Sequence, residues 1–195
     1  MCYRVQFGLG FALLLLCIFQ SGCVLSTQWS DNVALSEHGS EANHPALIDG
    51  NLETIAVIPA KNDRVFAVKF PAVKQVRKIV IHNGNLFRFD VDYLDSKTSE
   101  WKTIYSVRQR RDLENERAQS MYVLDRLDIE TEAIRINVSR TVDDDVITKP
   151  IREPGDKVID RGLTIGGVYY PHFRVLRPAW AQIREVEVYH LASAK

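Results

Sequence analysis

The sequence predicts an all-β fold, an antiparallel β-sandwich or jelly roll, for most of the 195-residue chain. Apolar residues recur at every second position in several short runs, which is the spacing of half-buried strands. Turn-forming segments separate these runs, for example His82-Asn83-Gly84-Asn85. No segment between residues 34 and 141 carries a sustained helical stripe. Together these observations predict seven or eight short strands around one core.

The expected strands follow one another along the chain, and each has one apolar face. Alternation marks strands at 66–70, 87–93, 134–138 and 186–188, with Leu191 just beyond the last, and further apolar runs mark strands at 76–82, 101–107 and 120–127. Successive side chains of a strand point to opposite faces, so each run turns one face toward a core. On this alternation we expect Phe87 to be buried.

The composition excludes several functional classes. The chain has 25 Lys and Arg residues against 25 Asp and Glu residues, so nucleic acid is not an expected partner. All three cysteines lie within the first 23 residues, which leaves the rest of the chain without a disulfide or a cysteine-based zinc site. No nucleophile paired with a base, opposed carboxylate pair or histidine metal motif stands out, so we do not expect an enzyme.

The N-terminus has the layout of a secretory signal peptide. Arg4 precedes an uncharged apolar run at 7–19, and the small residues Ser21 and Gly22 follow. A helix of this run spans about 20 Å, whereas a bilayer core needs about 30 Å. We therefore expect residues 1–22 to be an export signal.

The tetrad Gln20-Ser21-Gly22-Cys23 resembles a bacterial lipobox, although Gln20 stands where an aliphatic residue is usual. The resemblance implies a diacylglycerol and palmitate on Cys23, a lipidated tether at 23–33, and anchoring in a bacterial cell envelope, at the outer membrane or cell surface. Two or three acyl chains give stable membrane anchoring. The alternative is that Cys23 is an incidental residue beside an ordinary cleavage site.

Three segments of the body carry a second resemblance. They are Ala46-Leu47-Ile48-Asp49-Gly50-Asn51-Leu52-Glu53-Thr54, the stretch from Val76 to Trp101, and Ala181-Gln182-Ile183-Arg184-Glu185-Val186-Glu187-Val188-Tyr189. In this order they resemble a discoidin-type domain, the coagulation factor V/VIII C-terminal module of the galactose-binding-like superfamily. The resemblance implies a binding domain over 34–195 and places Trp101 in the core.

The same resemblance implies one structural calcium ion (Ca2+). Its ligands would be carbonyl oxygens, two carboxylates and the oxygens of a threonine, from Ala46, Asp49, Asn51, Thr54, Arg184 and Glu185. Calcium prefers six to eight such oxygen ligands. The alternative is an Asx-turn that closes a loop, with Glu185 as a surface carboxylate.

A carbohydrate site needs an aromatic surface and planar polar groups, and two regions supply them. His82, Asn85 and Arg88 cluster around one loop between strands, and Arg110 lies in a polar stretch at 108–119. Each of these residues could equally be an ordinary loop or strand residue, and a charge run is usually a solvated loop.

The segment 141–178 is an insertion, because the resembling domains connect these strands by a short loop. Its apolar and aromatic content predicts that it packs on the sandwich as a hairpin or covers one end of it. A Gly-Gly pair followed by Tyr169 and Tyr170 is the candidate recognition surface, and the alternative is that these rings cap the core. Asp143, Asp144 and Asp145 are expected in a solvated turn.

These features predict a non-catalytic, membrane-anchored lipoprotein that recognises carbohydrate at the cell envelope. The alternative is a protein-interaction or structural subunit of an envelope complex, contacting its partner through 141–178. An exposed aromatic residue beside Asn, His or Arg at a sandwich end would favour carbohydrate. A broad apolar patch at 158–178 would favour a protein partner.

Overall fold

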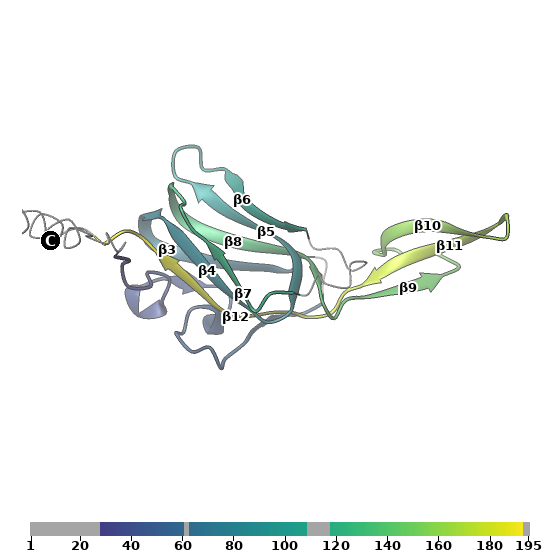
Figure 1. Cartoon of the computed structure of the whole chain (residues 1–195), viewed down its shortest axis with the longest axis horizontal. Coiled ribbons are helices and arrows are strands. Elements are labelled where there is room, and N and C mark those ends of the chain that lie inside the picture. The colour runs from purple at the N-terminus through teal and green to yellow at the C-terminus, as the bar shows by residue number, and fades with distance from the viewer. Residues whose placement is uncertain (1–27, 61–62, 109–117, 193–195) are drawn as a thin grey trace, which may run out of the picture.

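The protein is an antiparallel β-sandwich from which a third, smaller sheet projects (Figure 1). The computed structural model describes residues 28–60, 63–108 and 118–192. Its strands are β1 (Glu41–Ala42), β2 (Ala56–Ile58), β3 (Val65–Val76), β4 (Lys78–Asn83), β5 (Leu86–Asp95), β6 (Trp101–Arg108), β7 (Met121–Leu124), β8 (Ile129–Thr141), β9 (Asp145–Lys149), β10 (Lys157–Ile165), β11 (Val168–Arg177) and β12 (Ala181–Tyr189). Two short 3-10 helices, η1 (Ser36–His38) and η2 (Pro45–Leu47), precede β2. The all-β prediction is confirmed.

The sandwich consists of a five-stranded sheet in the order β1-β3-β8-β5-β6 and a four-stranded sheet in the order β2-β12-β4-β7. Every strand pair is antiparallel. The alternating apolar residues of the sequence fill the space between the sheets. Phe89 of β5 is fully buried and meets the ring of Tyr122 of β7 edge to face, with 5.0 Å between ring centroids. Phe87 is also buried, as its place in the alternation predicts.

The core position expected for Trp101 is wrong. Trp101 begins β6, an edge strand on which only Val107 is buried, and 38% of the residue is exposed. An edge strand has a neighbouring strand on one side only, so its side chains are covered from one side and stay partly exposed. The guanidinium of Arg135 lies over the indole ring, 4.2 Å from its centroid. Trp101 is therefore half of a surface cation–π pair.

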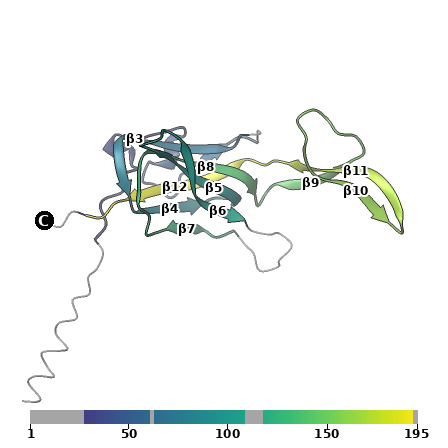
Figure 2. The same cartoon turned by 90° about the horizontal axis from the view of Figure 1, so that it is seen from above.

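The insertion forms a separate sheet in the order β10-β11-β9 and projects beyond one end of the sandwich (Figures 1 and 2). The expectation that it packs on or covers the sandwich is wrong, although a β10–β11 hairpin is present. The turn between these strands has Gly166 at φ 57° and Gly167 at φ 82°, the positive values of a type I′ hairpin turn. The insertion strands pair with one another through this turn and two ladders, and none of them joins a sheet of the sandwich.

The two ends of the described chain lie together, at the opposite end of the sandwich from the insertion (Figure 2). Trp29 forms an antiparallel bridge with Leu191, and the Ser30 N–H donates to the His190 carbonyl at 3.0 Å. Within the described residues, no helix is long and apolar enough to cross a membrane. Cys23 and the signal segment lie outside the described residues.

Candidate functional site

Buried polar side chains fix both ends of the insertion to the sandwich. Arg64, just before β3, donates from Nη1 to Oδ1 of Asp144 at 2.7 Å and from Nη2 to Oδ2 at 3.0 Å. The same guanidinium donates to the carbonyls of Ser139 and Ala179, at 3.1 and 3.0 Å. Bidentate arginine–carboxylate pairs add geometric specificity to their energy. Arg64 therefore links the segment at 139–144, where the chain leaves the sandwich, to Ala179, where the chain returns to it.

Asp144 completes this cluster, and the solvated turn expected for it is wrong. Its carboxylate also accepts from the Ala179 N–H at 2.7 Å and from the N–H and hydroxyl of Thr141 at 3.0 and 2.8 Å. Burial alone would raise the pKa of Asp144, but the hydrogen bonds from Arg64, Ala179 and Thr141 outweigh it and lower the pKa. Asp144 is 1% exposed because it joins the two crossing segments.

Asn85 makes a second connection between the sandwich and the two ends of the insertion, a place we call the junction. Its Nδ2 donates to Oδ2 of Asp143 at 2.7 Å and to the Trp180 carbonyl at 2.8 Å, and its Oδ1 accepts from the Gln182 N–H at 2.8 Å. The residue is buried. At Gly84 beside it, a Cβ would stand 2.7 Å from the Gln182 carbonyl oxygen, so only glycine fits. Asn85 thus positions the junction with its own polar atoms.

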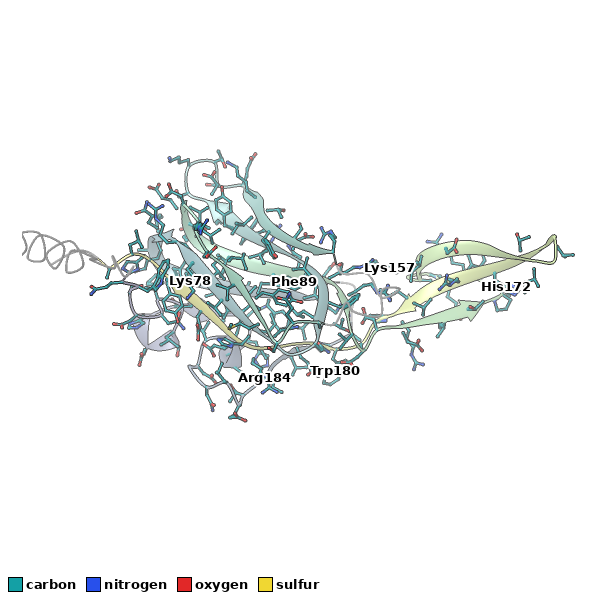
Figure 3. All side chains as sticks on the ribbon, viewed as in Figure 1. Lys78, Phe89, Lys157, His172, Trp180 and Arg184 are labelled. Carbon is teal, nitrogen blue, oxygen red and sulfur yellow. The ribbon has the colours of Figure 1, made fainter. Side chains whose placement is uncertain are left out.

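A cleft of about 590 Å³ opens where the insertion meets the sandwich. Its volume is in the range of small-ligand sites. The apolar lining comes from both parts of the molecule: Val138, Ile147, Val175, Leu176 and Pro178. The charged lining consists of Arg64, Lys149, Asp156, Lys157 and Arg177. Figure 3 shows Lys157 at the inner end of the insertion, next to the sandwich.

An exposed aromatic residue lies at the same junction. Trp180 is 58% exposed, and its backbone carbonyl accepts the hydrogen bond from Asn85. It stands two residues after Pro178, which lines the cleft (Figure 3). An indole ring at the surface offers an apolar face of the kind that stacks on the C–H face of a sugar.

The other sequence-predicted ligand residues do not line the cleft. His82 Nε2 lies 3.0 Å from Oε1 of Glu187 on the outer side of the four-stranded sheet. Arg88 is half-buried on β5. Arg110 lies outside the described residues, and Tyr169 and Tyr170 are described only by their backbone, on β11 next to the β10–β11 turn.

The proposed calcium ligands lie in two segments that the fold brings together. Asp49 accepts from the Asn51 N–H at 2.9 Å and from the Thr54 hydroxyl at 2.8 Å, which forms the Asx-turn that the sequence offered as the alternative. Ala46 lies in η2, and Arg184 is the bulge residue of β12, between the register pairs of Ile183 and Glu185.

Glu185 is the unusual member of this set, because it is 2% exposed rather than a surface carboxylate. Neither of its carboxylate oxygens has a hydrogen-bond partner among the described residues. The pKa of Glu185 is raised to about 7, mainly by burial and also by the negative charges of Asp49 and Glu187, which together outweigh the lowering by the nearby Gly50 N–H. The Gly50 N–H is close enough to favour the charged form but makes no hydrogen bond of normal geometry, so this buried carboxylate costs free energy that a cation would offset.

The donor set fits a hard cation better than a transition metal. It combines two carboxylates with hydroxyl and carbonyl oxygens, the ligands that calcium prefers. Within the described part of the chain, no three His, Cys, Asp or Glu side chains gather into a metal-binding group. The residues therefore fit calcium through their oxygen atoms, most of them from the backbone and Thr54.

Comparison with known proteins shows the fold of the chain. No family model and no curated protein sequence matches it. Among solved structures, the fucose-binding module SpX-3 of Streptococcus pneumoniae has a TM-score of 0.52 at 13% identity, with 84% of this chain and 100% of that one covered. CpGH89CBM32-6 of Clostridium perfringens has a TM-score of 0.50 at 13% identity, with 83% and 100% covered.

A further similar structure is truncated AlyQ, described as containing CBM32 and alginate lyase domains. Its TM-score is 0.51 at 12% identity, and the alignment covers 86% of this chain but 35% of that one. The chain therefore shares the galactose-binding-like fold of family 32 carbohydrate-binding modules, as the sequence resemblance implied.

Sequence reasoning did not identify the charged residues of the cleft. Lys149, Lys157 and Arg177 are far enough apart in sequence to form no motif, and Arg64 lies in a loop more than 70 residues before them. The apolar and aromatic composition of the insertion indicated an ordered segment, but it did not indicate which charged residues come together. The antiparallel pairing of β9, β10 and β11 brings these residues to one place.

Proposed function

We propose that this chain is a non-catalytic, lipid-anchored protein of a bacterial cell envelope that binds carbohydrate. The observation that carries the proposal is the cleft at the end of the sandwich, whose lining combines apolar and charged side chains. The exposed Trp180, whose backbone carbonyl accepts from the buried Asn85, offers an aromatic surface of the kind that sugars stack on. The fold shared with carbohydrate-binding modules supports the same function.

The position of the tether fits this proposal. Lipidation of Cys23 would anchor the chain at the end where Trp29 pairs with Leu191, opposite the insertion. The cleft and Trp180 would then face away from the membrane, toward glycans outside it. Replacing Cys23 with Ser should move the protein from the membrane fraction to the soluble fraction. Retention of the variant in membranes, with no palmitate incorporated by the wild type, would contradict lipidation.

Calcium has a structural role in this proposal. The carboxylates of Asp49 and Glu185, the Thr54 hydroxyl and nearby carbonyls would hold the ion between the first loop and the last strand. The buried, unpartnered carboxylate of Glu185 supports this assignment. The ion would neutralise that carboxylate and tie the η2 segment to β12, and it would take no part in a reaction.

Binding of the soluble form, residues 24–195, to a glycan array tests the carbohydrate function. We expect selective retention of a subset of glycans and loss of binding when Trp180 is replaced with Ala. The Trp101→Ala variant is the matched control, because Trp101 is also exposed, at the end of β6 that pairs with Leu94, and does not line the cleft. An array without any bound glycan would contradict the proposal.

A specific observation also supports the alternative, a protein-interaction subunit. Apolar residues of the insertion are exposed, namely Ile151, Ile159, Ile165 and Val168, with exposed fractions of 48% to 73%. Exposed apolar patches mark interaction sites when they are contiguous. Cross-linking in intact cells from a photoreactive residue at position 165 would then capture one envelope protein, whereas a glycan-binding role predicts no single protein product.

A further inference from the structure

The cleft at the base of the insertion has an unequal charge balance. Four cationic side chains line it, from Arg64, Lys149, Lys157 and Arg177, against the single acid Asp156. The whole chain has equal numbers of both charges, so this excess is local. A concave surface lined by one sign of charge concentrates ligands of the opposite sign.

Two of these cations already have protein partners. Arg64 is paired with Asp144, at 2.7 Å, and that pair is buried. Lys149 Nζ lies 2.9 Å from Oε2 of Glu153 and 3.1 Å from Oδ1 of Asp156. These contacts neutralise both side chains and use the one acid of the lining.

The other two cations, Lys157 and Arg177, are exposed and have no hydrogen bond or ion pair to any described residue. The β9–β11 register places Asp145 opposite Arg177, yet the two form no ion pair, and Asp145 Oδ1 accepts from the Val146 N–H. Lys157 pairs in register with Leu176, which is apolar. The net positive charge of the cleft therefore comes from Lys157 and Arg177.

We propose that this cleft binds an acidic saccharide, with the sugar rings against its apolar lining residues and the carboxylates of uronic acid residues on Lys157 and Arg177. This assignment rests on the proposed carbohydrate function and adds the class of sugar and the site. Arginine can bind a carboxylate through two parallel hydrogen bonds, and lysine supplies a point charge. The two cations belong to neighbouring strands of the insertion sheet, so both charges are held on one framework.

The apolar part of the lining favours a sugar over a small inorganic anion. Ile147 and Pro178 are half-buried and present aliphatic surface, which a phosphate or sulfate ion would not contact favourably. A pyranose ring has an apolar C–H face and a hydroxylated edge. A cleft of about 590 Å³ also exceeds the size of a single inorganic ion and suits a short oligosaccharide.

Titration calorimetry with two matched oligosaccharides tests the proposal on the protein purified in detergent. The probes are a tetramer of galacturonic acid and the same tetramer after reduction of its carboxyl groups to alcohols, which removes the charge and keeps the ring stereochemistry. We expect the acidic tetramer to bind at least tenfold more tightly. The affinity should also fall as ionic strength rises, because exposed charges are screened by salt.

Three variants locate the site. Lys157→Gln and Arg177→Gln should each weaken binding of the acidic tetramer about tenfold, the effect of losing one charge-assisted hydrogen bond. Arg174→Gln is the matched control, since Arg174 is exposed on the same strand three residues away, faces Asp160 and does not line the cleft. It should leave the affinity unchanged. All three positions are exposed, so unchanged melting temperatures should accompany these results.

The outcomes separate this inference from the general function. Equal affinity for both tetramers, or unchanged affinity in Lys157→Gln and Arg177→Gln, would overturn the acidic-saccharide site while carbohydrate binding could stand. Absence of binding by either tetramer, with a neutral glycan bound on an array, would also overturn it. Absence of binding to every glycan would overturn the proposed function as well.

Discussion

The sandwich and the insertion are built from the same kind of strand but differ in how their side chains are buried. The sandwich places two sheets face to face, and its core includes fully buried residues on nearly every long strand. The insertion is one sheet without a second layer, and its described buried side chains, Val175 and Leu176, lie toward its base. A sheet normally needs a second layer to bury its apolar face.

This difference in burial indicates that the sandwich supplies most of the stability, whereas the insertion is free to carry recognition residues. Burial of apolar surface stabilises the sandwich, whereas the insertion depends on its ladders and on the Arg64 and Asn85 contacts at its base. Elements that carry few buried contacts can vary without unfolding the domain, and binding residues are often found on such elements. The cleft lies between the sandwich and the base of the insertion and is lined by residues of both.

Truncation of a core ring should give the largest effect. Phe89→Ala removes a fully buried ring that contacts Tyr122, so we expect the free energy of unfolding to fall by about 3–5 kcal/mol. Urea denaturation followed by tryptophan fluorescence measures this loss. A loss below about 1 kcal/mol would mean that the core does not dominate stability.

Removal of the junction cation should rank second. Arg64→Met leaves the buried Asp144 carboxylate without its ionic partner, and we expect a loss of about 3 kcal/mol. The hydrogen bonds from Thr141 and Ala179 remain and should keep the loss at the lower end for a broken buried pair. Urea denaturation of both proteins at neutral pH measures it.

Acid should remove the contribution of this pair in the wild type. The pKa of Asp144 is lowered from 3.8 in the folded state, so its contribution is present above pH 3.8 and is lost as the pH falls through the folded value. In Arg64→Met this acid dependence should be weaker. An identical acid profile in both proteins would contradict the role assigned to the pair.

The calcium site should respond to both ion and pH. The folded pKa of Glu185, about 7, exceeds its ordinary value of 4.5, so without calcium its contribution is full below pH 4.5 and is lost as the pH rises through about 7. Calcium competes with the proton, so the rise in melting temperature on adding calcium should be larger at pH 8 than at pH 6.

Glu185→Gln should abolish this response and, without calcium at pH 8, should stabilise the protein by about 1–3 kcal/mol, because it removes an unpaired buried charge. Glu53→Gln, an exposed neighbour in the same loop, is the control and should behave like the wild type. If Glu185→Gln keeps the calcium response, the ion is not bound there.

Substitution at the far end of the insertion should give the smallest effect. Ile165 and Val168 flank the Gly166-Gly167 turn and are 60% and 54% exposed. Replacing both with Ser should change the free energy of unfolding by less than about 0.5 kcal/mol, as surface substitutions usually do. A loss above 2 kcal/mol in urea denaturation would show that the insertion contributes to the global fold.

The period-two pattern of the sequence predicted the sandwich because each strand buries one face, and residues such as Phe66, Phe89 and Ile136 must alternate to do so. Trp101 was misplaced because alternation does not tell an edge strand from a central one. The direction of the insertion also could not be predicted, since apolar content does not say whether a sheet lies on a neighbour or projects from it.

The candidate site was less predictable than the fold. The Asx-turn at Asp49 and the last-strand Glu185 were identified from spacing and resemblance, whereas burial of Glu185 depends on packing between segments 130 residues apart. The pairing of Arg64 with Asp144 joins residues 80 positions apart, and no local pattern reports such a contact. Long-range pairs of this kind become visible only in the folded chain.

The arrangement of β12 determines how the protein would respond to mechanical force. This strand starts at Ala181, directly after the junction, and its far end is hydrogen-bonded to the first described segment through Val33 and Ser30. A ligand pulled at the cleft against an anchored N-terminus would load β12 along its length. Its antiparallel hydrogen bonds to β2 and β4 run across that direction, so they would be sheared together instead of being opened one at a time.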